Sequence, residues 1–195
     1  MIEEILKLDS KLFLYLNNLG TSKFDIFWIS LSKIEANILM YLFLILLLFY
    51  IQKIRPKLIY IFYLFFVIAL MIAITDQGAN IFKDSFQRLR PCYNESIIDS
   101  LRLVKENCGG KYGFFSAHAS NSFSLAIFFG LLFINRISYI IMITIVYASL
   151  ISYSRIYLGV HYPIDIIFGS FFGIFVGFVM YSFVYLKFLK FFDKT

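Results

Sequence analysis

Long apolar runs separated by short polar segments form the main pattern of this chain. They predict membrane-spanning helices at about 36–53, 58–75, 116–134, 137–153 and 164–189, because about 20 mostly apolar residues cross a bilayer. The second helix is expected to continue through Lys83 towards Arg90. The predicted fold is all-α: a polytopic membrane helix bundle of about five to six helices, counting an N-terminal interfacial helix. The whole of 1–195 forms one domain, with the bundle at 36–189 and an outer loop at 91–115.

The first residues have a different pattern. Apolar side chains recur at helical spacing over 2–19, and Glu3, Glu4, Lys7, Asp9 and Lys11 cover the other face. Such a helix is too polar to span, so residues 1–23 are predicted to lie in the membrane interface. A frayed polar terminus is the alternative. No cleavable signal peptide is expected, since the chain starts Met1-Ile2-Glu3-Glu4, without a basic region.

Composition agrees with a membrane protein. The chain is 61% hydrophobic and 15% charged, with a mean hydropathy of +0.81, whereas soluble domains are about half apolar and a quarter charged. The net charge of +6 could suggest a nucleic-acid partner. We exclude that class, because the basic residues fall in short loops and form neither a patch nor a stripe.

The basic loops predict the orientation. Three groups follow the first, third and fifth spans, namely Lys53, Arg55 and Lys57; Arg136; and Lys187, Lys190 and Lys194. The positive-inside rule makes their side of the membrane cytoplasmic. The segments 88–115 and 154–162 then meet on the outer side.

Cations and histidines gather in those outer segments. Lys83 and Arg90 are expected on one helical face together with Gln87, with Pro91 ending the helix. A lysine and an arginine suit phosphate oxygens, although snorkelling interfacial cations are the alternative. Downstream, Ser116 is a natural N-cap that places His118 in the first turn of a helix. That position favours a bound anion, although an interfacial histidine without a task would look the same.

The most specific spacing lies at the start of the last span. Arg155 precedes His161, Pro163 suits the first helical position, and Asp165 can reach one imidazole nitrogen of His161. A carboxylate there fixes the tautomer, so the other nitrogen is free to attack phosphorus.

These three segments resemble the signature of the type 2 phosphatidic acid phosphatase family, which includes the vanadium haloperoxidases. Its pattern is Lys-x6-Arg-Pro, then Pro-Ser-Gly-His, then Ser-Arg-x5-His-x3-Asp. The first and third match fully, and the resemblance covers about residues 76–175. The second departs at Phe115 and Ala117, but keeps Ser116 and His118.

The resemblance implies a role for each matching residue. His161 would form a phosphohistidine, Asp165 would orient it, and His118 would protonate the leaving group. Lys83, Arg90, Ser116 and Arg155 would bind the phosphate. No metal or other cofactor is implied, and two histidines with scattered acids offer no zinc or two-metal cluster.

Three further features carry expectations. Cys92 and Cys108 could form a disulfide on an oxidising side of the membrane; two unpaired thiols are the alternative. The glycine-rich segment 109–113 is expected to be a flexible turn, since it fits no P-loop pattern. Gly169, Gly173 and Gly177 form a small-residue face, for packing within the bundle or for a homo-oligomer.

The resemblance implies a lipid phosphate phosphatase. Residue usage looks bacterial, so the expected place is the inner (plasma) membrane, with the site on the periplasmic or extracellular side. The expected substrate is an envelope lipid phosphate, with undecaprenyl diphosphate slightly ahead of lipid A, and with phosphatidylglycerol phosphate and phosphatidic acid as further options. Alternatives are a phosphotransferase of the same fold, a non-catalytic binding protein and, least expected, a haloperoxidase.

Overall fold

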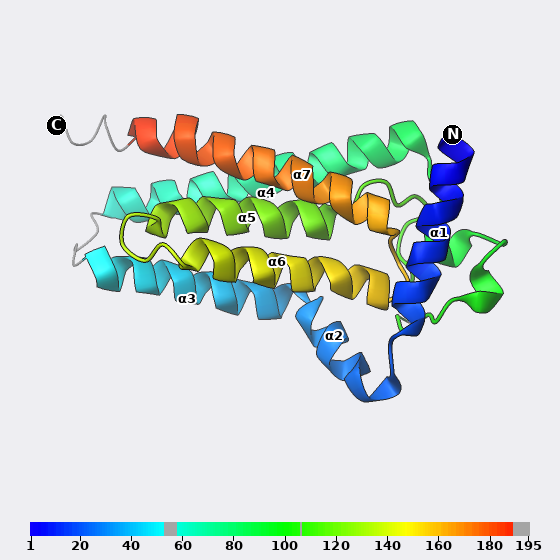
Figure 1. Cartoon of the computed structure of the whole chain (residues 1–195). Helices are drawn as coiled ribbons and strands as arrows, with labels where there is room; N and C mark the ends of the chain where they lie inside the picture. Colours follow the sequence, from blue (N-terminus) through cyan, green and yellow to red (C-terminus); the bar gives the residue numbers. More distant parts are fainter. Residues whose placement is uncertain (53–57, 106, 189–195) are drawn as a thin grey trace.

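Five long helices lie side by side in the computed structural model (Figure 1), which describes residues 1–52, 58–105 and 107–188. They are α3 (Ile34–Gln52), α4 (Leu58–Phe86), α5 (Ala117–Phe133), α6 (Ile140–Tyr157) and α7 (Pro163–Val179), which the π-helical η4 (Met180–Tyr185) continues. Within the described residues the β-structure is one isolated bridge, between Leu89 and Tyr112. The predicted all-α bundle is confirmed.

The helices match the predicted spans. Leu58–Phe86, Ile140–Tyr157 and Pro163–Phe188 are long and apolar enough to cross a membrane, while Asn37–Ile51 and Ala117–Phe133 are apolar but shorter. Of the basic residues used to predict orientation, Lys53, Arg55, Lys57, Lys190 and Lys194 lie outside the described residues.

One end of the bundle carries the polar segments. The helix α1 (Ile2–Asn18) lies across this end, and η1 (Ser22–Phe24) with α2 (Asp25–Leu31) leads from it to α3. The loop between α4 and α5, with η2 (Pro91–Tyr93) and η3 (Ile98–Ser100), lies at the same end, as does the turn between α6 and α7 (Figure 1). All three motif segments therefore converge here.

The inward face of α1 differs from the predicted one. Asp9, assigned above to the polar outer face, is only 4% exposed, and the inward stripe is Asp9, Phe13 and Asn17. The Asn17 amide donates to the backbone carbonyls of Arg102, Ile156 and Tyr157 at 3.0 Å each. The buried polar groups of α1 thus have partners, which the hydrophobic pattern alone could not reveal.

The three glycines of α7 pack against α5 within the chain. A Cβ atom at Gly169, Gly173 or Gly177 would overlap the backbone carbonyl oxygen of Ser116, Ser120 or Ser124, respectively. Only hydrogen atoms at these positions allow the two backbones to approach so closely. This face is covered by α5, so it cannot supply the homo-oligomer contact considered above.

We expect Gly173→Ala to destabilise the bundle, because its methyl group would push α7 away from α5. Overpacking of this kind costs about 1–3 kcal/mol, which should lower the midpoint of thermal unfolding in detergent micelles by several degrees. Gly110→Ala is the matched control, since a Cβ there meets nothing within 4 Å. Equal midpoints for the two variants would contradict the packing described.

Candidate active site

The turn between α6 and α7 positions His161. Gly159 has a φ of +83°, which only glycine adopts freely, and α7 then begins at Pro163. Asp165 faces back: its Oδ2 lies 3.4 Å from His161 Nδ1 and accepts a hydrogen bond from the Tyr162 backbone N–H at 3.0 Å. With one nitrogen of His161 facing a carboxylate, the other is available for chemistry.

The start of α5 lies next to this pair. Ser116 is the N-cap, accepting from the Ala119 N–H at 3.4 Å, and its own N–H donates to the Asp165 carbonyl at 3.1 Å. His118 follows in the first turn and lines a cavity of about 350 Å³ with Arg155 and Lys105. This backbone hydrogen bond between Ser116 and Asp165 therefore joins the second motif segment directly to the third.

The first motif reaches the site in an unexpected way. The helix α4 ends at Phe86, and Gln87 has a φ of +47°, so Arg90 does not continue the helical face of Lys83. Instead, Arg90 N–H donates to the Lys111 carbonyl at 3.1 Å, and Gly113 N–H donates to the Arg88 carbonyl at 2.8 Å. The predicted common helical face of Lys83, Gln87 and Arg90 is wrong, because pairing with the next loop segment replaces the last helical turn.

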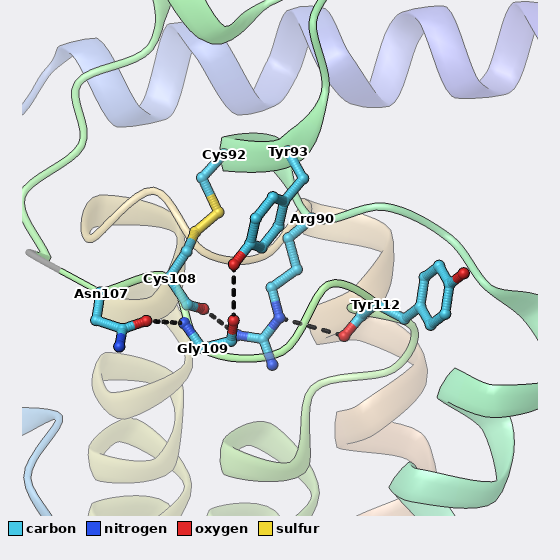
Figure 2. The surroundings of a disulfide bond; sticks show 7 residues. All are labelled: Arg90, Cys92, Tyr93, Asn107, Cys108, Gly109 and Tyr112. Atoms are coloured by element: carbon cyan, nitrogen blue, oxygen red, sulfur yellow. Dashed lines mark hydrogen bonds between the residues drawn. A yellow bond between two sulfur atoms is a disulfide. The ribbon is translucent and has the colours of Figure 1, made fainter.

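The loop between α4 and α5 holds Arg90 in place (Figure 2). Its Nε donates to the Tyr112 carbonyl at 3.2 Å, and its Nη1 donates to the Cys108 carbonyl at 3.0 Å. Cys108 is joined to Cys92 by a disulfide, and Gly109 turns the chain with a φ of +78°. The glycine-rich segment and Cys108, which precedes it, thus present carbonyl groups to the Arg90 guanidinium.

Burial and the positive charges of the motif residues both affect the pKa of His161. The imidazole is 2% exposed, and burial holds its pKa well below the usual range, with the charges of Arg90, Arg155 and Lys83 acting in the same direction. A hydrogen bond with the Gly113 backbone acts in the opposite direction. His161 is therefore neutral at neutral pH, the form in which a ring nitrogen carries a free lone pair.

Arg88 is a site residue that the sequence analysis missed. Its guanidinium bridges two buried carboxylates, Asp165 Oδ1 at 2.7 Å and Asp9 Oδ2 at 2.5 Å, and lies 4.2 Å from the ring centroid of Tyr162. Asp9 Oδ1 also accepts from the Ile164 N–H at 3.0 Å. Arg88 thus links Asp165, which faces His161, to α1. The sequence signal that could have identified Arg88 was its position two residues before Arg90 of the first motif.

Arg155 and Lys105 add positive charge to the cavity at His118. Arg155 is 3% exposed and donates through Nη1 to the Ser32 hydroxyl. Its Nε is buried and has no hydrogen-bond partner among the described residues. Lys105, also missed from the sequence, has its pKa lowered by burial and by the charges of Arg155 and Arg90.

The described residues contain no group of three or more His, Cys, Asp or Glu side chains that could hold a metal ion. What they bring together is a neutral histidine beside a carboxylate, a second histidine at a helix N-terminus, and a set of cations. Such an arrangement can bind a phosphate group and stabilise negative charge that develops on its oxygens.

Comparison with known families and proteins agrees with this chemistry. The model of the PAP2 superfamily matches residues 62–189. A lipid A 4'-phosphatase of Porphyromonas gingivalis is 35% identical over 186 residues, covering 95% of this chain and 76% of the relative. A lipid A 4'-phosphatase of Bacteroides thetaiotaomicron is 34% identical over 183 residues, covering 93% and 79%.

Two solved structures have the same fold. The crystal structure of Aquifex aeolicus LpxE superposes with a TM-score of 0.65 at 25% identity, covering 89% of this chain and 94% of that one. A transmembrane PAP2-type phosphatidylglycerolphosphate phosphatase from Bacillus subtilis superposes with a TM-score of 0.67 at 16% identity, covering 92% and 86%.

We expect Arg88→Met to unfold far more easily than the parent protein. It leaves the Asp9 and Asp165 side chains, which are 1% and 0% exposed, without their cation, and breaking a buried ion pair costs about 3–5 kcal/mol. Unfolding in detergent micelles at neutral pH measures the loss. Adding Asp9→Leu to Arg88→Met should recover part of it, because one uncompensated carboxylate is removed.

Arg102→Met is the control for this variant. The Arg102–Asp25 pair is about a quarter exposed on both sides, and such partly solvated pairs contribute about 0–1 kcal/mol. If Arg88→Met lost no more stability than Arg102→Met, the bridging role of Arg88 would be wrong.

Proposed function

This chain belongs to the PAP2 superfamily and is a membrane lipid phosphatase, and from that premise we propose that it removes phosphate from lipid A through a phosphohistidine on His161. The observation that carries the proposal is the buried, neutral His161, one nitrogen of which faces Asp165. The positive charges of Lys83, Arg90 and Arg155 help to keep it neutral. The cations supply the charge stabilisation that a metal ion supplies in other phosphoryl-transfer sites.

In the first step, the His161 nitrogen that faces away from Asp165 attacks phosphorus and forms the N–P bond. The bond from phosphorus to the lipid oxygen breaks, and His118 gives its proton to that oxygen, so that the lipid leaves as an alcohol. Asp165 stabilises the imidazolium character that His161 acquires. Ser116, Lys83, Arg90 and Arg155 bind the phosphate oxygens as charge develops on them.

In the second step, water attacks the phosphohistidine, and His118 accepts the proton from that water. The N–P bond breaks, and the products are inorganic phosphate and the free His161. A lipid or sugar hydroxyl in place of the water would make the protein a phosphotransferase.

The substrate and location rest on the relatives and on charge. Two relatives that cover nearly the whole chain are lipid A 4'-phosphatases, which supports lipid A ahead of undecaprenyl diphosphate. Arg136, in the α5–α6 connection, and Lys187, near the end of the last helix, belong to the bundle end opposite the site. The positive-inside rule thus favours a bacterial inner membrane protein whose site opens on the periplasmic side.

We expect purified protein with EDTA and no added metal to release inorganic phosphate from lipid A faster than from undecaprenyl diphosphate, phosphatidylglycerol phosphate or phosphatidic acid. Vanadate should inhibit, because it adopts the five-coordinate geometry of the transition state. Phosphate transferred to a labelled acceptor without free phosphate would instead identify a transferase. Activity lost with chelator and restored by magnesium would refute the histidine mechanism.

The two histidines should respond differently to the leaving group. His161→Ala should abolish turnover and phosphoenzyme with every substrate. His118→Ala should slow lipid hydrolysis about a hundred- to ten-thousand-fold, but slow nitrophenyl phosphate much less, because nitrophenolate leaves without a proton. Equal losses on both substrates would assign His118 to another role, and phosphoenzyme in His161→Ala would mean that the nucleophile is elsewhere.

A further inference from the structure

A second cavity leads from His118 into the membrane part of the bundle. It has a volume of about 410 Å³ and lies between α3, α4 and α5, with His118 in its lining. Apolar side chains such as Ile38, Ile72 and Leu125 line much of it. Since His118 is the proposed donor to the leaving oxygen, the lipid alcohol lies on this side of the phosphate.

Polar side chains also line this cavity, and one of them is acidic. Asp76 and Asn121 both line it, and the Asn121 amide donates to Asp76 Oδ1 at 2.9 Å. The Thr75 hydroxyl donates to Asn121 Oδ1, which fixes the amide with its N–H group towards Asp76. Among the described residues, Asp76 Oδ2 has no hydrogen-bond partner.

A carboxyl group within a spanning helix is costly and is seldom kept without a function. Asp76 lies in α4, within the Leu58–Phe86 segment that is long enough to cross the membrane. The hydrogen bond from Asn121 occupies one oxygen of the Asp76 carboxylate. The second oxygen remains an acceptor inside the cavity. The matching ligand group is therefore a hydrogen-bond donor.

The position of this acceptor fits the leaving group. Asn121 is three residues after His118 in α5, so it lies on the same helical face, about 4.5 Å deeper into the bundle. A donor held there would be only a few bonds from the ester oxygen that His118 protonates. A neutral donor suits the apolar lining better than an ammonium group, whose burial would cost more.

We propose that Asp76, oriented by Asn121, binds a hydroxyl or amide N–H group of the lipid alcohol close to its phosphate ester. This inference rests on the proposed function and narrows its substrates to lipid phosphates that carry such a donor. Phosphatidic acid lacks such a donor, because both glycerol oxygens beside its phosphate are acylated. Asp76 is thus a specificity-determining residue of the leaving-group side.

Ceramide 1-phosphate and phosphatidic acid provide the test in mixed detergent micelles. Both are phosphate monoesters of two-chain lipids, but only the first has a hydroxyl and an amide N–H beside the phosphate. A hydrogen bond to a charged group changes a binding constant by about tenfold to hundredfold. The kcat/KM of the parent protein should therefore be at least about tenfold higher for ceramide 1-phosphate than for phosphatidic acid. In Asp76→Ala the ratio of the two values should fall to near one.

The ratio is measured on one preparation, so it does not depend on the fraction of folded protein. Ile72→Ala, which enlarges the same cavity without touching a polar group, should lower both values by a similar factor and keep the preference. Asp76→Asn, which retains an acceptor oxygen, should keep part of it.

An unchanged ratio in Asp76→Ala, or no preference in the parent protein, would overturn the assignment of Asp76 while the phosphatase function stands. If the parent protein released phosphate from no lipid and did not hydrolyse nitrophenyl phosphate either, the proposed phosphatase function itself would be wrong.

Discussion

The close contact between α5 and α7 is the constraint on which the site depends. Gly169, Gly173 and Gly177 allow the backbone of α7 to lie against carbonyl groups of α5. With the two helices held this closely, their N-termini are level, and the N–H of Ser116 bonds to the carbonyl of Asp165. His118 lies in the first turn of α5 and His161 just before α7, so this backbone packing fixes where the two histidines lie relative to each other.

The second constraint is the compensation of buried charge. Asp165 is 0% exposed, and Arg88 neutralises it from the side away from His161, sharing its charge with Asp9. Among the described residues, Lys83, Arg90 and Arg155 form no salt bridge with a carboxylate. A phosphate group would supply the missing negative charge. The cations that, after burial, help to lower the pKa of His161 therefore favour the binding of an anion.

The N-terminal helix is part of this arrangement, although the matched family region begins at residue 62. Asp9 accepts hydrogen bonds from Arg88 and from the Ile164 N–H, so α1 stabilises both the first motif segment and the start of α7. Asn17 ties the other end of α1 to the end of α6. The amphipathic helix α1 therefore stabilises the site through these polar contacts.

Hydrophobic runs and motif spacing are local properties, so they were enough to predict the bundle, its apolar helices and the convergence of three motifs at one end. The sequence also predicted Ser116 as an N-cap and Asp165 within reach of His161, since Ser116 and Ala119 are three residues apart and His161 and Asp165 are four residues apart. The end of α4 at Phe86 and the burial of Asp9 against Arg88 could not be predicted in this way and are seen in the folded chain. Both depend on partners distant in sequence, and a polar residue on a helix carries no local sign of the charge it will meet.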